Sequence, residues 1–159
     1  MAIYLKYGKI DGDATQDQFV KWIDISSVQF GSGRSVYTPV GSAQKREASN
    51  ASVSEVTLTK TYDAASTGLM TKSLTGTKGD DAKIYFTETG EGGAEVFLKI
   101  TLKDALVSGY STSSGGDRPS ESFSLNFTDV EYSYAPMGED NTLGDPIIVG
   151  FDVATGKSR

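Results

Sequence analysis

Three acidic residues near the N-terminus have the type and spacing that suggest a cation site: Asp11, Asp13 and Asp17 in IDGDATQDQF. Carboxylates bind calcium in EF-hand loops, but such a loop has glycine at its sixth position and glutamate at its twelfth. Gln16 and Trp22 occupy those positions in this chain. The segment is therefore interpreted as an acidic, solvated turn, and no metal site is predicted.

A second group of carboxylates, Glu88, Glu91 and Glu95, has the residue type used in glycoside hydrolysis, where two carboxyl groups flank the bond that breaks. The intervening GEGG is typical of a hairpin tip, where acids are readily hydrated, so a turn is favoured. Residues 75–83, TGTKGDDAK, contain glycine and lysine but lack the Gly-Lys-Ser/Thr ending of a phosphate loop. A turn is the interpretation there too.

The composition argues against catalysis. The 159 residues include no cysteine and no histidine. Thiolate nucleophiles, Ser-His-Asp triads and the usual zinc sites each need one of these side chains. We therefore predict that the chain is not an enzyme and needs no cofactor. Its 15 basic and 21 acidic residues give a net charge of −6, and the basic residues are scattered, so nucleic acid is not expected as a partner.

The N-terminal sequence MAIYLKYGKI has neither the apolar stretch nor the small-residue cleavage site of a secretory signal. No segment approaches the roughly 20 apolar residues of a membrane-spanning helix. We expect the protein to fold and assemble in the cytoplasm, without membrane insertion, and to use an export route without a cleaved leader.

Alternation of apolar and polar residues, typical of half-buried strands, dominates the chain. It recurs at residues 3–5, 22–30, 54–62, 84–86, 94–104, 122–134 and 147–153. The phase slips by one residue at Ser26–Ser27 and at Thr128–Asp129, where a β-bulge would bend the strand. The sequence therefore predicts a mostly-β single domain over residues 1–159, a compact antiparallel β-barrel made of two wrapped sheets.

Residues 64–75 are predicted to form one short α-helix packed on the barrel. Asp63 is its expected N-cap and Gly76 its terminator. The apolar stripe expected to face the barrel consists of two i,i+4 pairs, Ala65–Leu69 and Met70–Leu74.

Two loops and three aromatic residues depart from the alternating pattern that predicts the barrel strands. Residues 31–50 form the longest loop, with a short strand expected at 35–37, and loops of this length are usually functional or disordered. Residues 111–119 are small and polar and predict a flexible connection between two strands. The rings of Tyr4, Tyr85 and Phe97 are out of phase with their apolar neighbours. The second face of their strands is therefore expected to be covered by the helix or by another subunit.

Five stretches follow one another in an order and spacing that is more specific than any of them alone. They are WIDISSVQFG, LTKTYDAASTGLM, KITLKDALV, VSGYSTSSGGDRPSESFSLNFTDVEYSYAP and VGFDVATGK. Together they resemble the Hcp (haemolysin-coregulated protein) family, the tube protein of type VI secretion systems. The resemblance spans nearly the whole chain, although Phe30 and Phe151 stand where tryptophan is frequent in the family.

The resemblance implies a β-barrel with one helix that forms hexameric rings, which stack into a tube with a wide channel. It also implies partners: a contractile sheath and baseplate, a spike of VgrG and PAAR-type proteins, and small effector proteins carried in the channel. Because Hcp is released without a cleaved leader, the protein is expected to reach the extracellular space or a target cell.

The resemblance assigns residues to surfaces as well. Ser27 and Gln29 are expected to contact effectors in the lumen, since they point away from the core on a strand that borders the channel. Tyr4, Tyr85 and Phe97 are expected at the subunit interface. The ring-stacking loop is expected to consist of Gly41, Ser42, Ala43, Gln44, Lys45, Arg46, Glu47, Ala48, Ser49 and Asn50.

Two other functions stay open at this point. One is a monomeric β-barrel that binds a small apolar ligand or a glycan, and the other is an enzyme that uses carboxylates. The oligomeric state separates the tube subunit from the monomeric barrel.

Overall fold

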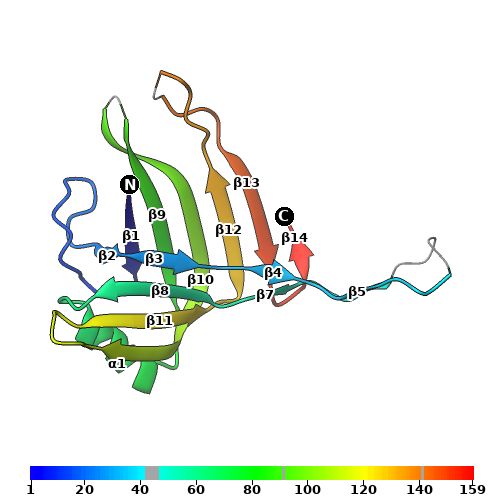
Figure 1. The fold of residues 1–159 in the computed structure, drawn as a ribbon, viewed down its shortest axis with the longest axis horizontal. Helices are drawn as coiled ribbons and strands as arrows, with labels where there is room; N and C mark the ends of the chain where they lie inside the picture. The colour runs from blue at the N-terminus through cyan, green and yellow to red at the C-terminus, as the bar shows by residue number, and fades with distance from the viewer. Residues whose placement is uncertain (42–46, 91, 141) are drawn as a thin grey trace.

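The structure is a computed structural model that describes residues 1–41, 47–90, 92–140 and 142–159, and most of it is antiparallel strand (Figure 1). In chain order the elements are β1 (Ala2–Tyr7), β2 (Ile23–Ile25), β3 (Ser27–Gln29), β4 (Ser32–Gly33), β5 (Val36–Tyr37), β6 (Glu47–Ala48), β7 (Ser52–Val53), β8 (Val56–Thr61), α1 (Ser66–Thr75), β9 (Asp80–Gly90), β10 (Gly93–Ser113), β11 (Ser120–Asn126), β12 (Asp129–Tyr134), β13 (Ile147–Asp152) and β14 (Lys157–Ser158).

Two antiparallel sheets share the long strand β10. Sheet A has the order β14-β13-β12-β10-β9-β1-β2, and sheet B has the order β10-β11-β8-β3. The N-terminal part of β10 lies between β9 and β12, whereas its C-terminal part, from Leu106 onward, pairs with β11. The strands of sheet A run upright in Figure 1 and those of sheet B cross them, so the two sheets form two layers.

One apolar core fills the space between the layers. Leu58 and Phe123 of sheet B face Ile84 and Leu102 of sheet A, and none of the four is more than 1% exposed. Helix α1 adds the fully buried Leu69. The predicted mostly-β fold, with two wrapped antiparallel sheets and one short helix, is confirmed.

Hydrogen bonding between the described strands does not close the barrel. Strands β2 and β3 belong to different sheets and meet at the corner residue Ser26, whose amide donates to the carbonyl of Thr59 at 2.8 Å. The slip at Ser26–Ser27 therefore marks the passage of the chain from sheet A to sheet B and not a bulge. The slip at Thr128–Asp129 has the same cause, because β11 lies in sheet B and β12 in sheet A. Both predicted bulges are wrong.

The bulges of this fold lie in β10. Its register shifts between Val96 and Leu98, between Leu102 and Ala105, and between Val107 and Gly109. Bulges bend a strand and increase its twist, and this bending allows β10 to belong to both layers. Phe97, which interrupts the alternation in the sequence, is the extra residue of the first bulge.

Helix α1 begins later than predicted. Its N-cap is Ala65, which makes no side-chain capping bond, so the prediction of Asp63 as N-cap is wrong. The carboxylate of Asp63 instead accepts the amide of Ala65 at 2.9 Å in the turn before the helix. Gly76 ends the helix as predicted, with its amide donating to the carbonyl of Lys72.

Only half of the predicted helical stripe is buried. Ala65 and Leu69 are 0% exposed, but Met70 and Leu74 are 48% and 72% exposed. The expectation that the second pair faces the barrel is therefore wrong. An i,i+4 spacing shows that two residues share one side of a helix but does not show which side the sheets cover.

The segment predicted as a long loop is a projecting hairpin in its described parts, residues 31–41 and 47–54. Two short ribbons form it: β4 pairs with β7, and β5 pairs with β6. The expected strand at 35–37 is present as β5. Figure 1 shows this segment, called the arm below, extending away from both sheets.

The turn between β10 and β11 is shorter than predicted, and the β9–β10 hairpin tip lies where it was predicted. The connection predicted at 111–119 is shorter, because β10 continues to Ser113 and only residues 114–119 form the turn. It lies at the end of sheet B opposite the arm (Figure 1). The carboxylates Glu88 and Glu95 are cross-strand partners near the β9–β10 hairpin tip, as expected, while Glu91 lies outside the described residues.

Three tyrosine hydroxyls are held in the protonated form by the fold. Burial is the main cause that raises the pKa of Tyr7, Tyr110 and Tyr132, each to about 12. The Tyr7 hydroxyl donates to the carbonyl of Ala105 at 2.7 Å, and the Tyr110 hydroxyl donates to Glu121.

These shifts predict loss of stability at alkaline pH. Tyrosine in an unfolded chain titrates near about pH 10, so the folded state binds these protons more tightly than the unfolded state does. The free energy of unfolding should therefore fall as the pH rises from about 10 toward about 12. Urea unfolding at fixed ionic strength measures this, and a Tyr7→Phe/Tyr132→Phe variant should show a shallower fall. An equally steep fall in the variant would contradict the assignment.

Candidate functional site and assembly surfaces

Sheet A extends beyond sheet B and leaves an apolar surface without cover. Cross-strand register places Phe86 of β9, Leu98 of β10, Tyr134 of β12 and Ile147 of β13 in one row across four strands. These side chains lie on the core face, because Leu98 is two residues from the buried Ile100. We define this row, together with Val149, as the apolar shelf.

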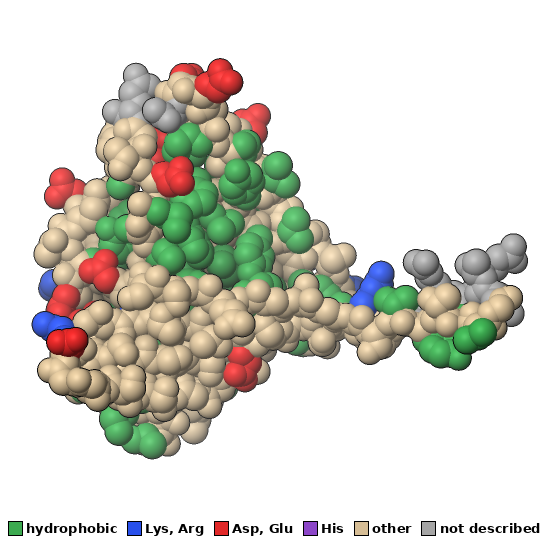
Figure 2. Space-filling view, viewed as in Figure 1, with side chains coloured by type: hydrophobic (Ala, Val, Ile, Leu, Met, Phe, Trp, Pro, Cys, Tyr) green, Lys and Arg blue, Asp and Glu red, His purple; other side chains and the backbone are tan. Residues whose placement is uncertain are grey.

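Exposure rises along the core face of sheet A toward the shelf. Leu102 is 0% exposed and Ile100 is 3% exposed, whereas Tyr134, Ile147 and Val149 are 46%, 63% and 58% exposed. Figure 2 shows the result as a hollow lined by hydrophobic side chains, above the band of sheet B. Contiguous exposed apolar surface of this kind marks interaction sites in soluble proteins.

The outer face of sheet B is lined mainly by small neutral side chains, with Glu55 at its edge accepting from Ser108 at 2.8 Å. Four strands contribute cross-strand rows of small neutral residues: Ser27, Thr59, Ser122 and Ser111 in one row, and Gln29, Thr57, Ser124 and Gly109 in the next. The inward neighbours Val28 and Leu58 pack on the core. The two predicted lumen residues, Ser27 and Gln29, are therefore both exposed on this neutral face.

The outer face of sheet A is covered by the chain itself. The ring of Tyr4 stacks on Phe19 at a centroid distance of 4.5 Å, and Tyr85 lies 5.1 Å from Trp22. Phe19 and Trp22 come from the segment between β1 and β2. Tyr4 is 8% exposed within one chain, so its burial needs no neighbour. An interface role for Tyr4 and Tyr85 stays a prediction.

Phe97, the third predicted interface residue, has a different position. Its ring lies 6.4 Å from the ring of Phe86, a shelf residue. The bulge in β10 turns Phe97 out of the alternation, beside the shelf, so its out-of-phase position comes from the bulge and not from a second covered face.

The predicted ring-stacking loop lies in the arm. Glu47 and Ala48 form β6, and Gly41, Ser49 and Asn50 lie in described parts of the arm. Ser42, Ala43, Gln44, Lys45 and Arg46 lie outside the described residues. Val36, Tyr37 and Val40 are 52%, 64% and 103% exposed on the arm. A two-stranded ribbon is marginally stable alone in water, so the arm is a candidate contact with another molecule.

The acidic segment between β1 and β2 contacts the start of α1. Asp13 accepts the amide of Ala64 at 3.3 Å, which ties the segment to the start of α1. Among the described residues, no group of three or more acidic side chains is arranged to bind a metal ion. No helix of the described chain has the length and apolar character to cross a membrane.

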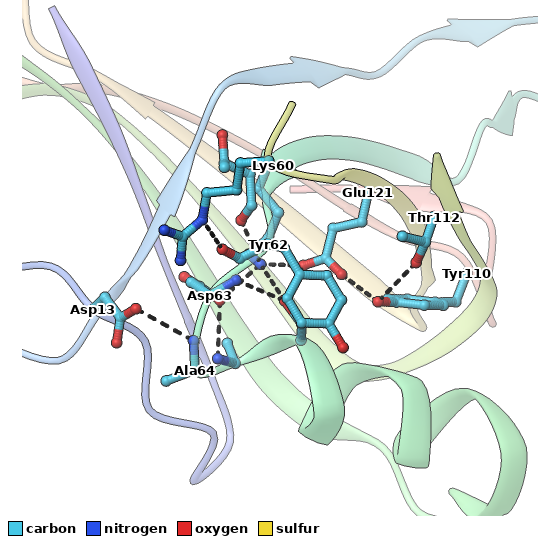
Figure 3. A network of polar contacts seen from close by, with 12 residues as sticks. Asp13, Lys60, Tyr62, Asp63, Ala64, Tyr110, Thr112 and Glu121 are labelled. Atoms are coloured by element: carbon cyan, nitrogen blue, oxygen red, sulfur yellow. Dashed lines mark hydrogen bonds and ion pairs between the residues drawn. The ribbon is translucent and has the colours of Figure 1, made fainter. Parts of the chain in front are cut away.

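A buried ionic network joins α1 to sheet B (Figure 3). Lys60 of β8 and Glu121 of β11 form an ion pair with side chains that are 0% exposed. Lys60 also pairs with Asp63 at 2.7 Å, and Ser66 at the start of α1 donates to Glu121 at 2.7 Å. Tyr110 of β10 completes the network by donating to Glu121. Every buried polar side-chain atom in the described residues has a hydrogen-bond partner.

The network predicts an asymmetric response to substitution. Lys60→Met leaves Glu121 buried without its counter-charge, and breaking a buried pair in this way costs about 3–5 kcal/mol. The double variant Lys60→Met/Glu121→Leu removes both charges and should regain most of that loss. Urea unfolding measures both.

The matched control is Lys72→Met. The pair between Lys72 and Asp80 at 2.9 Å is about one third exposed, and exposed pairs contribute about 1 kcal/mol or less. A Lys60→Met variant that loses no more stability than this control would refute the buried-network assignment.

The fold and these surfaces place the chain among proteins of two crossed antiparallel sheets with one helix and a projecting arm. A family model described as "Type VI secretion system effector, Hcp" matches residues 4–134. The chain therefore belongs to the Hcp family of type VI secretion, and the resemblance seen in the sequence is confirmed.

Individual relatives support the assignment to the Hcp family. Protein hcp1 of Pseudomonas aeruginosa is 34% identical over 104 residues, which cover 64% of each chain, so the match spans less than two thirds of that protein. A solved structure of a type six secretion system protein is 27% identical, with a TM-score of 0.90 and 99% coverage of both chains. Hcp1 from Salmonella typhimurium, at 23% identity, has a TM-score of 0.79 and shares the fold over 99% of this chain and 98% of that chain.

Proposed function

We propose that this protein is the structural subunit of a type VI secretion tube and forms hexameric rings. The observation that carries the proposal is the apolar shelf, because one chain leaves it exposed and a neighbouring copy would cover it. Membership of the Hcp family supports the same role. A tube subunit acts by assembly, so no catalytic residue is assigned.

The edges of sheet B support ring closure. In the described chain, β3 pairs only with β8, and β10 beyond Leu106 pairs only with β11. Sheet B therefore ends in two strands with an unpaired edge, on opposite sides of the molecule (Figure 1). Two different edges that join by rotation give a heterologous contact, and repeated heterologous contacts close into a ring.

The neutral face of sheet B is the proposed channel wall. If sheet B continues from copy to copy, its outer face with Ser27 and Gln29 lines one side of the closed sheet and contacts small effector proteins. The arm is proposed to contact the adjoining ring, as predicted for Gly41 to Asn50, of which residues 42–46 lie outside the described residues. The sheath, the baseplate and the VgrG and PAAR-type spike are the further partners, and the assembled protein is proposed to leave the cell without a cleaved leader.

The oligomeric state tests the proposal. Native mass spectrometry of the purified protein at tens of micromolar should give six times the mass of the chain, and negative-stain microscopy should show annular particles. A monodisperse monomer under these conditions would contradict the proposal of a tube subunit.

Such a result would favour the monomeric binding barrel. The observation for that alternative is a cavity of about 350 Å³ at one end of the barrel, and a smaller apolar one of about 230 Å³. The smaller cavity is lined by Phe30, Ser32, Ala51, Val53, Val130, Tyr132, Val149, Gly150 and Phe151.

A charge on the channel wall should change cargo retention without changing the ring. Gln29→Arg introduces a positive charge on the neutral face, on a side chain that is exposed and outside the core. Native mass spectrometry should still give hexamers, while the amount of small protein that co-purifies with the ring should change at least several-fold. Gln18→Arg, the same chemical change in the exposed segment over sheet A, should leave retention unchanged. Loss of hexamers in Gln29→Arg would show that this residue does not face the channel.

Shortening the arm should separate ring formation from stacking. Deletion of Gln44 to Glu47 removes residues that belong to neither sheet A nor sheet B, so isolated rings should persist while tube growth is impaired. Tube length under the electron microscope is the measurement. Tubes of unchanged length would discard the stacking role of the arm.

A further inference from the structure

Helix α1 carries a second exposed apolar surface on the side of the molecule opposite the shelf. Met70 and Leu74, one turn apart, point away from the core and are 48% and 72% exposed. Figure 2 shows hydrophobic side chains at the lower end of the molecule, where Figure 1 places α1. A helix exposed to water on one side typically carries polar residues on that side, and two adjacent exposed apolar residues indicate an interaction surface.

The two apolar surfaces lie beside the two unpaired edges of sheet B. The shelf rises beyond β3, and α1 packs against β10 at the other edge (Figure 1). A rotation that continues sheet B from the β10 edge of one copy to the β3 edge of the next, with the neutral faces on one side, would bring α1 toward the shelf. One repeated contact would then cover both surfaces.

The charges around the two surfaces are complementary. Residues 64–79 contain Lys72 and Lys78 and no acidic residue, and Lys72 pairs with Asp80 just beyond this range. From Asp129 to Asp152 inclusive there are six acidic residues and no lysine or arginine, and two of the six, Asp129 and Glu131, pair with Arg159. Three of the acids, Glu139, Asp140 and Asp145, lie in the connection between the shelf residues Tyr134 and Ile147. Complementary potentials of this kind orient two surfaces and exclude like-charged pairing.

We propose that the exposed side of α1, through Met70 and Leu74, docks on the apolar shelf of a second copy of this chain. This inference rests on the proposed ring and names the two faces that meet in it. The occupant of the shelf is the helix of the neighbouring copy, with Lys78 set against the acidic connection between β12 and β13.

Cysteine cross-linking tests the contact directly, because the chain contains no cysteine of its own. The variant Leu74→Cys/Ile147→Cys, treated with a short bismaleimide, should give a ladder of covalent oligomers up to the hexamer on denaturing gels. A mixture of the two single variants should give dimers and no longer species, because each copy then carries one reactive face. The control Leu74→Cys/Val20→Cys uses a residue that is 56% exposed between β1 and β2, and it should give no ladder.

A second measurement covers the case in which the cysteine variant does not assemble. Leu74→Ala shortens an exposed side chain and should leave the fold intact, but it should weaken ring association about 10-fold or more on dilution. Val20→Ala should leave association unchanged. Large losses from truncating a few central apolar residues are typical of protein interfaces.

The outcomes separate this inference from the proposed ring. Hexamers of the unsubstituted protein, without a ladder from Leu74→Cys/Ile147→Cys and without weakening by Leu74→Ala, would overturn the helix-to-shelf contact and leave the ring standing. Absence of hexamers in the unsubstituted protein would overturn the ring itself. A ladder from the control pair would show that the cross-linking is random collision and would also overturn the contact.

Discussion

Unequal strand lengths in the two sheets are the constraint on which the rest of the structure depends. Strands β9 and β10 have 11 and 21 residues, whereas β8 and β11 have six and seven. The apolar alternation of the longer strands continues past the end of the shorter sheet. Apolar side chains on the same core-facing side of sheet A are therefore buried at one end of the sheet and exposed at the other. Burial of such a surface drives association in water.

The outer faces of the two sheets need no second copy, because one is largely covered by aromatic residues of the same chain and the other is polar. The segment between β1 and β2 lays Phe19 and Trp22 over the outer face of sheet A, where Lys6 and Lys99 also approach the rings of Trp22 and Tyr85. Sheet B instead presents hydroxyl and amide groups, which water can hydrate without an apolar partner. Among the described residues, the shelf, the arm and the outer side of α1 each bring together two or more exposed apolar side chains, whereas Val20 and Ile148 are exposed elsewhere.

Local periodicity explains what the sequence could predict and what it could not. Alternation located the strands because each strand places one side on the core, and the order of the motifs identified the family. A change of sheet shifts the phase of the apolar alternation by one residue, as a bulge does. Alternation alone therefore predicts bulges at Ser26 and Thr128, where the chain in fact passes between the sheets. The positions of Leu74 and Ile147 depend on which distant segment covers them. Their local patterns are those of buried residues, and no spacing within the helix or strand reveals that the cover is missing.

The buried network gives these surfaces a fixed relation to one another. A buried ion pair adds little net stability compared with apolar side chains, but an arrangement that separates Lys60 from Glu121 leaves Glu121 without its counter-charge in the core. Because the network joins β8, β10 and β11 to the first residue of α1, the helix can leave sheet B in only one direction without that loss. The edge of β10 and the exposed side of α1 are therefore held as one rigid face. A repeated contact between copies needs such a face, because a small change in its angle would open the ring.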